Sequence, residues 1–206
     1  MTHSTTNAPA VYLASASPRR QELLERMGIA FALVTQGVDE QVHADEPPEV
    51  FVIRLALEKA RAGFANRPAG AMAPVLGADT AVVIEDDILG KPADQADALA
   101  MLERLSGQTH RVLTGVALVD EAGEATRLSV SSVTFRDISL AERQAYWRSG
   151  EPEGKAGGYA IQGLGGVFAE QLEGSYSGVM GLPMFETDDL LRSFGVASAL
   201  SAPAGQ

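Results

Sequence analysis

Apolar positions along the chain fall into short continuous runs and longer stretches with helical spacing, and the two kinds alternate. Five short apolar runs have the length expected of strands, at residues 11–15, 31–35, 75–84, 112–119 and 128–135. Gly123 lies in the polar stretch between the last two runs and predicts a hairpin turn there. A chain in which strands alternate with helices favours an α/β fold with a mixed sheet.

The clearest helical spacing lies within residues 48–65. The apolar residues of this stretch are 3, 4, 3 and 4 residues apart, which places them on one face of an amphipathic helix. They are Val50, Ile53, Leu57, Ala60 and Phe64. Weaker signals predict further helices at residues 17–27, 94–105, 139–148 and 184–194.

Two of these helices begin at recognisable capping residues. Ser17 can cap the first helix, Pro18 suits the first helical position, and Gly28 predicts its end. Ser139, with Glu142 three residues later, forms a capping-box signature for the helix over residues 139–148.

Residues 154–181 differ from the rest of the chain in their glycine content. They hold nine of the 21 glycines, so we expect either tight loops around a ligand or a structural crossover there. No internal repeat and no long low-complexity linker divides the sequence, and we predict a single domain over residues 11–196. Residues 1–10 are predicted to be a disordered lead-in and residues 197–206 a frayed tail.

Composition excludes several classes of function. The chain has 206 residues, with 16 Lys and Arg against 27 Asp and Glu, which gives a formal net charge of −11 at pH 7. That balance argues against nucleic acid as a partner, because a phosphate backbone needs a broad basic face. Cysteine is absent, which rules out disulfides, thiolate zinc sites and cysteine nucleophiles. The three histidines lie too far apart in the sequence to predict a His-rich metal site or a Ser-His-Asp triad.

The sequence also carries no signal for export or for membrane insertion. No stretch approaches the roughly 18 uncharged apolar residues of a membrane span. The first ten residues have no basic region followed by an apolar core. We therefore expect a soluble cytoplasmic protein without a membrane partner.

A predicted strand end leads into a helix start that carries hydroxyl groups and two arginines, at Ser15, Ser17, Arg19 and Arg20. Free backbone N–H groups and the positive end of the helix dipole attract phosphate at such a position. Arginine adds forked donors that fit phosphate oxygens. The alternative is an ordinary capped helix whose arginines are solvated.

Asp79 interrupts the otherwise apolar run at residues 75–84. A carboxylate inside such a strand is strongly disfavoured by desolvation unless it is paired or binds a metal. Asp79 could therefore bind Mg²⁺ or deprotonate a water molecule, or it could lie at a strand edge and face solvent. Asp39 and Glu40 could join Asp79 around one Mg²⁺, or they could be solvated turn residues.

Three lysines and a glutamine complete the candidate site. Lys91 and Lys155 each follow a glycine, which lets an ammonium group approach a polyphosphate without crowding, and Lys59 lies on the long predicted helix. Each lysine could equally be an ordinary surface charge. Gln162 offers both a donor and an acceptor, as a nucleobase edge requires.

Several common catalytic motifs do not occur in the sequence. It contains no P-loop, no G-x-S-x-G nucleophile elbow, no G-x-G-x-x-G fingerprint and no H-E-x-x-H. Neither P-loop nor serine-hydrolase chemistry is therefore supported. Cations that bind anions and hard oxygen ligands remain, and this combination suits metal-assisted phosphate chemistry.

Eight short motifs occur in order along the sequence. They are S-A-S-P-R-R at 15–20, G-V-D-E at 37–40, R-L-A-L-E-K-A at 54–60, G-A-D-T at 77–80, G-K-P at 90–92, L-S-G-Q-T-H at 105–110, E-P-E-G-K-A-G-G-Y-A-I-Q-G at 151–163 and G-S-Y-S-G-V-M-G-L-P at 174–183. Each motif alone is weak, but the ordered set resembles the Maf family of nucleoside triphosphate pyrophosphatases over nearly the whole chain.

The resemblance implies both a fold and a reaction. The fold would be an elongated mixed sheet flanked by helices, with a cleft between two lobes, similar to inosine triphosphatases. The reaction would convert a nucleoside triphosphate to the monophosphate and pyrophosphate with a divalent cation, Mg²⁺ or Mn²⁺, and a homodimer is plausible by the same resemblance. Asp79 would accept the proton of the attacking water, and Glu40 and Asp79 would bind the metal. The residues implied to hold the triphosphate are Ser15, Arg20, Lys59, Lys91 and Lys155.

Three positions distinguish branches of the family. Arg19, Thr80 and Gln162 match the branch that resembles dTTP/UTP pyrophosphatases, which would act on pyrimidine triphosphates, modified ones included, and prevent the incorporation of non-standard nucleotides. In the branch that acts on 7-methyl-GTP, tryptophan, glutamine and glutamate stand at these positions. The alternatives are therefore a 7-methyl-GTP pyrophosphatase and a non-catalytic nucleotide-binding regulator of septum formation and cell division.

Overall fold

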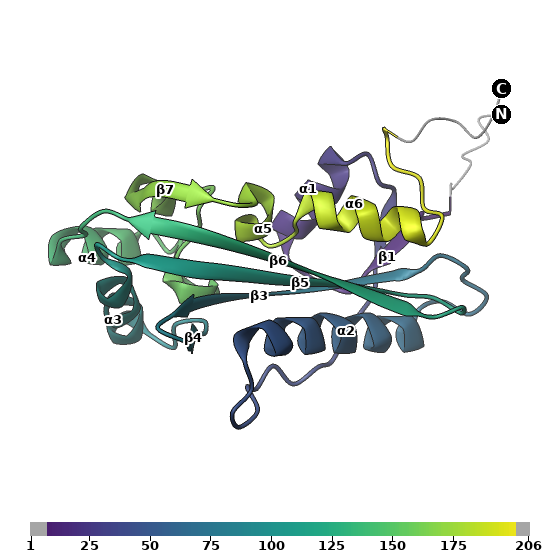
Figure 1. Ribbon diagram of the computed structural model, residues 1–206, viewed down its shortest axis with the longest axis horizontal. Coiled ribbons are helices and arrows are strands. Elements are labelled where there is room, and N and C mark those ends of the chain that lie inside the picture. The colour runs from purple at the N-terminus through teal and green to yellow at the C-terminus, as the bar shows by residue number, and fades with distance from the viewer. Residues whose placement is uncertain (1–7, 201–206) are drawn as a thin grey trace.

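The computed structural model describes residues 8–200 and places their seven strands in one open mixed sheet (Figure 1). The strands are β1 (Val11–Leu13), β2 (Phe31–Leu33), β3 (Val75–Ile84), β4 (Asp87–Leu89), β5 (Thr109–Val119), β6 (Glu124–Phe135) and β7 (Ala169–Glu173). Their order is β2-β1-β3-β5-β6-β7, and β4 pairs with the end of β3. Strand β1 runs parallel to both of its neighbours and the other pairs are antiparallel. The predicted α/β fold with an elongated mixed sheet is confirmed.

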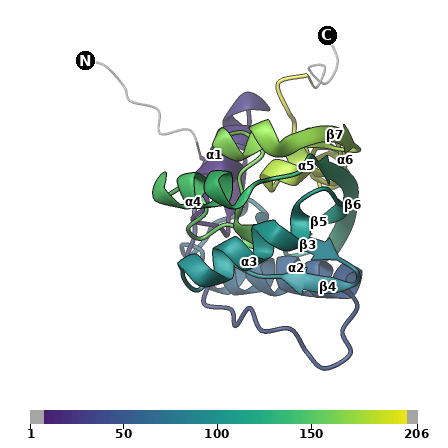
Figure 2. The same cartoon turned by 90° about the vertical axis from the view of Figure 1, so that its left-hand side faces the viewer.

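The helices cover both faces of this sheet. They are α1 (Pro18–Arg26), α2 (Pro48–Asn66), α3 (Gln95–Leu105), α4 (Leu140–Arg148), α5 (Tyr176–Met180) and α6 (Met184–Ser193), with short 3₁₀ turns η1 (Ala156–Gly158) and η2 (Leu164–Phe168). Helix α2 lies along one face, α1, α5 and α6 lie on the other, and α3 and α4 lie at one end, which faces the viewer in Figure 2. Within residues 8–200, no helix is long and apolar enough to cross a membrane.

The predicted boundaries of the ordered domain are only partly covered by the structure. Residues 1–7 of the predicted lead-in and residues 201–206 of the predicted tail lie outside the described residues. The single domain over residues 11–196 stays a prediction, although one continuous sheet runs through this part of the chain.

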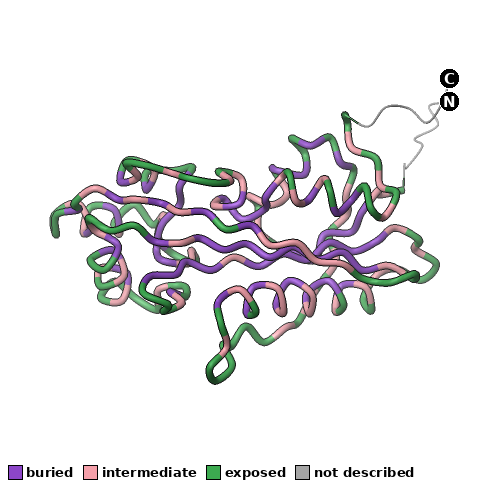
Figure 3. Tube along the Cα trace, viewed as in Figure 1, coloured by how far each residue is buried: buried purple, intermediate pink, exposed green. Residues whose placement is uncertain are grey.

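The core lies on both faces of β3, because successive residues of a strand point to opposite faces. Ala78 and Val82 belong to the larger core cluster, which includes residues of α1, α3 and α6. Ala81 and Val83 pack instead against Phe51, Val52 and Leu55 of α2. Figure 3 shows buried positions along the whole central part of the sheet. Asp79 has the same parity as Ala81 and Val83, so its side chain is directed to the α2 face, and Thr80 is directed to the α1 face.

Glycines let α2 approach the sheet closely. A Cβ at Gly77 would overlap the carbonyl oxygen of Ala56, and a Cβ at Gly115 would lie 2.5 Å from the carbonyl oxygen of Val52. Real Cβ atoms do not approach backbone this closely, so no other residue fits at either position without a shift of the helix. The glycine of G-A-D-T therefore sets the distance between α2 and the strand that carries Asp79.

One edge of β3 is open in the middle of the strand. Strand β1 pairs with β3 only at Val75 and Leu76, and β4 pairs with the same edge at residues 82–84. Between these two contacts, residues 77–81 have no strand partner on this edge within the described part of the chain. Asp79 lies in the centre of this gap, where side chains from both faces of the sheet can meet.

The structure differs from the sequence predictions mainly in short or polar elements. Strand β4 (Asp87–Leu89) follows β3 directly and is not among the five predicted strands, and β7 and α5 lie in the glycine-rich segment, where we predicted only loops or a crossover. Short elements contain too few residues to show a period. Ser139 and Glu142 form the predicted capping box, whereas the Ser17 side chain makes no capping hydrogen bond although it stands at the N-cap and Pro18 begins the helix.

His110 lies inside an aromatic cluster and should make the stability of the protein dependent on pH. Its ring packs edge-on against Phe135 and Tyr159, and its Nε2 is hydrogen-bonded to Tyr159 Oη over 2.8 Å. Burial lowers the pKa of His110 to about 4. In the unfolded chain a histidine has a pKa of about 6.5, so below that pH the unfolded state binds a proton that the folded state excludes, and stability falls.

Relative to a His110→Gln variant, the wild type should lose about 1.5 kcal/mol of unfolding free energy between pH 6.5 and pH 5. Urea unfolding of both proteins at the two pH values measures this difference. If the unfolding free energies of the two proteins changed with pH in parallel, His110 would not be the source of the pH dependence.

Candidate active site

Ten of the candidate site residues named in the sequence line one cavity of about 580 Å³. They are Ser15, Arg19, Arg20, Glu40, Lys59, Asp79, Thr80, Lys91, Lys155 and Gln162. The cavity opens at the gap in the edge of β3, between the start of α1, helix α2, the loop after β4 and the glycine-rich segment. The predicted cleft is thus present, and segments far apart in the sequence contribute to it.

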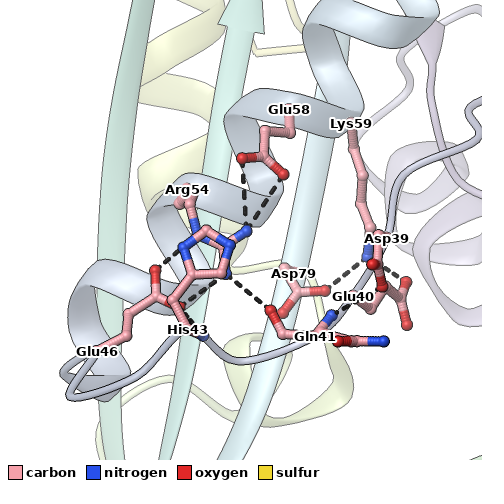
Figure 4. A network of polar contacts seen from close by, with 9 residues as sticks. All are labelled: Asp39, Glu40, Gln41, His43, Glu46, Arg54, Glu58, Lys59 and Asp79. Carbon is pink, nitrogen blue, oxygen red and sulfur yellow. Dashed lines mark hydrogen bonds and ion pairs between the residues drawn. The ribbon is translucent and has the colours of Figure 1, made fainter.

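Lys59 lies between two carboxylates at the floor of the cavity (Figure 4). Its Nζ is 2.6 Å from Asp79 Oδ1 and 2.6 Å from Glu40 Oε1. The Lys59 side chain is 4% exposed and the Asp79 side chain 11%. The alternative in which Asp79 lies at a strand edge and faces solvent is therefore wrong. The charge of Asp79 is balanced by a buried ammonium group, as a buried carboxylate requires.

Glu40 connects the floor of the cavity to its rim. Its second oxygen, Oε2, is 2.7 Å from the Nζ of Lys91, which follows β4 and has a 60% exposed side chain. Burial opposes the charged form of Glu40, but the hydrogen bonds and charges of Lys59 and Lys91 outweigh it and lower the pKa of Glu40 to about 2. Glu40 is therefore ionised at neutral pH and holds two of the predicted phosphate-binding lysines in place.

The loop that carries Glu40 is fixed to α2 by Arg54, which the sequence analysis did not single out (Figure 4). Arg54 forms a two-pronged ion pair with Glu46, at 2.6 and 2.7 Å, and donates to the Gln41 carbonyl oxygen at 3.1 Å. A forked guanidinium–carboxylate pair fixes both distance and orientation. The only sequence signal for this role was the position of Arg54 in the motif R-L-A-L-E-K-A.

The two arginines at the start of α1 are hydrogen-bonded to the segment whose residues Val179 and Met180 line the cavity. Arg19 Nε donates to the Met180 carbonyl oxygen at 3.1 Å, and Arg20 Nε donates to the Gly181 carbonyl oxygen at 2.8 Å. Arg20 also donates to Ser15 Oγ at 3.1 Å. These acceptors are neutral oxygens, and burial lowers the pKa of both arginines. Two partly desolvated cations that have no carboxylate bonded to them among residues 8–200 make this wall attractive to an anion.

Thr80 links Arg20 to a buried threonine that the sequence analysis missed. Thr114 Oγ1 donates to the Gly178 carbonyl oxygen at 2.8 Å, which uses its one proton. Thr80 Oγ1 therefore donates to Thr114 Oγ1 over 3.0 Å and accepts from Arg20 Nη2 over 3.2 Å. A threonine in a strand gives no sequence signal of such a role, because β-branched residues are common there.

Residues near the two ends of the glycine-rich segment form the remaining wall of the cavity. Lys155 Nζ donates to the Glu153 carbonyl oxygen at 3.1 Å. Burial lowers the pKa of Lys155, and the nearby charge of Arg19 lowers it further. Gln162 is exposed on the same wall and is free to meet a ligand.

The oxygen donors of the cavity suit a hard divalent cation that is also held by its substrate. Glu40 and Asp79 offer carboxylate oxygens, and the buried Gln36 Oε1, which has no hydrogen-bond partner among the described residues, lines the same cavity. Asp39 instead accepts from the Gln41 amide and does not line the cavity. Within residues 8–200, no three acidic or histidine side chains could hold a metal together. Mg²⁺ commonly takes one or two carboxylates and fills its other positions with phosphate oxygens and water.

Comparison with known proteins gives one consistent result. Residues 10–194 match the Maf-like protein family. The chain is 60% identical to the dTTP/UTP pyrophosphatase of Alkalilimnicola ehrlichii over 91% of this chain and 94% of that protein. It is 53% identical to the dTTP/UTP pyrophosphatase of Saccharophagus degradans, over 92% and 91% of the two chains, and 48% identical to that of Burkholderia pseudomallei, over 95% and 98%.

Proposed function

Because the chain belongs to the Maf-like protein family, we propose that it hydrolyses dTTP and UTP to the monophosphate and pyrophosphate. One observation carries this proposal: a buried carboxylate, Asp79, lies at the floor of a cavity whose walls carry five cationic side chains. Relatives of the same length that are named dTTP/UTP pyrophosphatases support the choice of substrate.

Asp79 is the proposed proton acceptor for the attacking water. Its Oδ1 is held by Lys59, and Oδ2 has no hydrogen bond to any residue of the described chain, so a water molecule can donate to it. The water oxygen bonds to phosphorus at the bridge whose cleavage releases pyrophosphate. The water proton goes to Asp79, and the pyrophosphate leaves with the electron pair of the broken P–O bond.

The cationic walls hold the triphosphate and balance its charge. Ser15, Arg20 and Lys155 would bind it from the α1 side and the glycine-rich side, and Lys59 and Lys91 from the floor and the rim. Glu40 and Asp79 would hold a divalent cation, Mg²⁺ or Mn²⁺, which when bound neutralises phosphate charge. Lys59 lies between these two carboxylates and holds one oxygen of each.

We propose that Arg19, Thr80 and Gln162 set the preference for pyrimidine triphosphates. Replacing Gln162 by Glu removes the amide donor and adds a negative charge, so kcat/KM for UTP and dTTP should fall about tenfold or more. Glu170→Gln, at an exposed position of β7 outside the cavity, is the control and should not change it. Steady-state kinetics with UTP, dTTP and GTP measure the effect, and an unchanged preference for the two pyrimidine triphosphates over GTP in the Gln162 variant would remove Gln162 from this role.

Product analysis tests the reaction itself. Incubation with UTP and Mg²⁺, followed by anion-exchange chromatography, should give UMP and pyrophosphate in equal amounts. Formation of UDP and orthophosphate would contradict the proposal. A cytoplasmic location, a homodimer, and the absence of a nucleic-acid partner stay predictions.

A further inference from the structure

The carboxylate of Glu151 collects three hydrogen bonds beneath the loop that carries Gln162. Oε1 accepts from Tyr146 Oη at 2.6 Å and from the Gly165 amide at 2.9 Å. Oε2 accepts from the Leu164 amide at 2.9 Å. Bonds to an ionised acceptor are about twice as strong as neutral ones, so this carboxylate fixes the C-terminal side of the loop firmly.

Tyr146 fixes the other side of the same loop. Its Oη, which donates to Glu151, accepts from the Ala160 amide at 3.0 Å, and the tyrosine is only 4% exposed. Tyr146 belongs to α4, a helix that begins in the Ser139–Glu142 capping box. Gln162 therefore lies between two backbone positions, residues 160 and 164, that are tied to the buried Tyr146 and to the half-buried Glu151, which contact each other.

Two glycines of the loop are required by this pair. A Cβ at Gly163 would overlap the carboxylate of Glu151, and a Cβ at Gly165 would lie 2.5 Å from Tyr146 Oη. Because the carboxylate is held by three donors, it cannot move aside without losing them. The first residue of the motif at 151–163 and its last residue thus pack directly against each other.

Ionisation of Glu151 agrees with this arrangement. Burial opposes its charged form, but the hydrogen bonds from Tyr146 and from the Gly165 and Leu164 amides outweigh burial and lower the pKa of Glu151. The acceptor is therefore charged at neutral pH and can serve all three donors.

We propose that Glu151, acting with Tyr146, is the positioning residue that sets the place of Gln162 in the cavity and thereby the discrimination between uracil and cytosine. This inference rests on the proposed function. The two bases present donors and acceptors in opposite order at the same edge. Gln162 presents one donor group and one acceptor, and it matches only the base whose order of donor and acceptor fits the place where its amide is held. Sites that bind by such contacts need placement to within roughly 0.5 Å.

The test uses Glu151→Gln and Tyr146→Phe in the full chain, with Glu170→Gln as the matched control. In Glu151→Gln, an NH₂ group takes the place of one acceptor oxygen and faces a backbone N–H. In Tyr146→Phe, the hydrogen bond from the Ala160 amide to the tyrosine hydroxyl is lost. Binding of the α,β-methylene analogues of UTP and CTP is measured by calorimetry, because these analogues cannot be cleaved at the α–β bridge. Turnover of UTP and CTP is measured in parallel, and melting temperatures report folding.

We expect the preference for the UTP analogue over the CTP analogue to fall about tenfold in both variants and to stay unchanged in the control. The loss should be in binding and KM more than in kcat, which a merely structural defect would not produce. Folded variants that keep the wild-type preference would overturn the inference even if UTP is hydrolysed. If the preference shifts but wild-type protein hydrolyses no triphosphate, the proposed function fails and the positioning role stands. Wild-type protein that binds neither analogue overturns both.

Discussion

Replacing Asp79 by Asn should lower kcat for UTP by about 10²- to 10⁴-fold, the usual contribution of a positioned general base. Asparagine has the same shape but cannot accept the proton of the attacking water. The Lys59 ammonium keeps its second carboxylate partner, Glu40, at 2.6 Å, so the fold should be retained. Steady-state pyrophosphate release measures the loss, and calorimetry with the α,β-methylene analogue of UTP should show affinity within a few-fold of wild type.

Asp87→Asn provides a matched control for this substitution. Asp87 lies on β4, beside the same cavity, but its side chain is 68% exposed and pairs with Arg104 on the surface. We expect its activity to equal that of the wild type. An Asp79→Asn protein that is folded and turns over UTP at a near-normal rate would refute the assignment of Asp79 as the proton acceptor.

Replacing Lys59 by Met should have the largest effect on stability. The methionine removes the cation between Asp79 and Glu40 and leaves the carboxylate of Asp79 buried without an ionic partner. Loss of one partner from a buried ion pair costs about 3–5 kcal/mol of unfolding free energy. Urea unfolding at pH 7 measures it as a lower midpoint at an unchanged slope. Turnover should also be lost, because the same ammonium is proposed to contact the triphosphate.

Arg61→Met tests whether this effect depends on burial. Arg61 is on the same helix, two residues away, and its ion pair with Glu124 has both side chains more than one-third exposed. Exposed ion pairs contribute little to stability, so only a small change is expected. If the Lys59 and Arg61 variants unfolded at the same urea concentration, the buried charge balance described for Asp79 would be wrong.

Two kinds of feature could be predicted from the sequence: long elements whose apolar residues recur at a regular spacing, and polar residues that interrupt such an element. Helix α2 is recognisable because apolar residues recur at helical spacing over about four turns, but the predicted buried face is wrong. Of its five residues only Ala60 is buried and Val50 is exposed, because the helix turns Phe51, Val52, Leu55 and Ala56 towards the sheet. Asp79 is recognisable because it interrupts an apolar strand. The arginines could be named because cations at a helix start are unfavourable for the helix itself, and Lys91 and Lys155 because a preceding glycine leaves room for an anion.

What the sequence did not predict depends on contacts between distant segments. The hydrogen bond from Arg20 to the Gly181 carbonyl oxygen joins positions that are 161 residues apart, and no local sequence pattern predicts it. Thr114 and Glu151 look like an ordinary strand residue and an ordinary loop carboxylate until the structure places them beneath Thr80 and the Gln162 loop. Strand β7 and helix α5 were missed because five residues are too few to display a period.

The most direct test of the account is pyrophosphate release by the wild-type protein from UTP, dTTP, CTP, GTP, ATP and 7-methyl-GTP, with Mg²⁺ and then with EDTA. We predict turnover that is led by UTP and dTTP and is abolished by EDTA. Turnover led by 7-methyl-GTP would contradict the roles given to Arg19, Thr80 and Gln162. A folded protein that binds these nucleotides and releases no pyrophosphate from any of them would contradict the central claim.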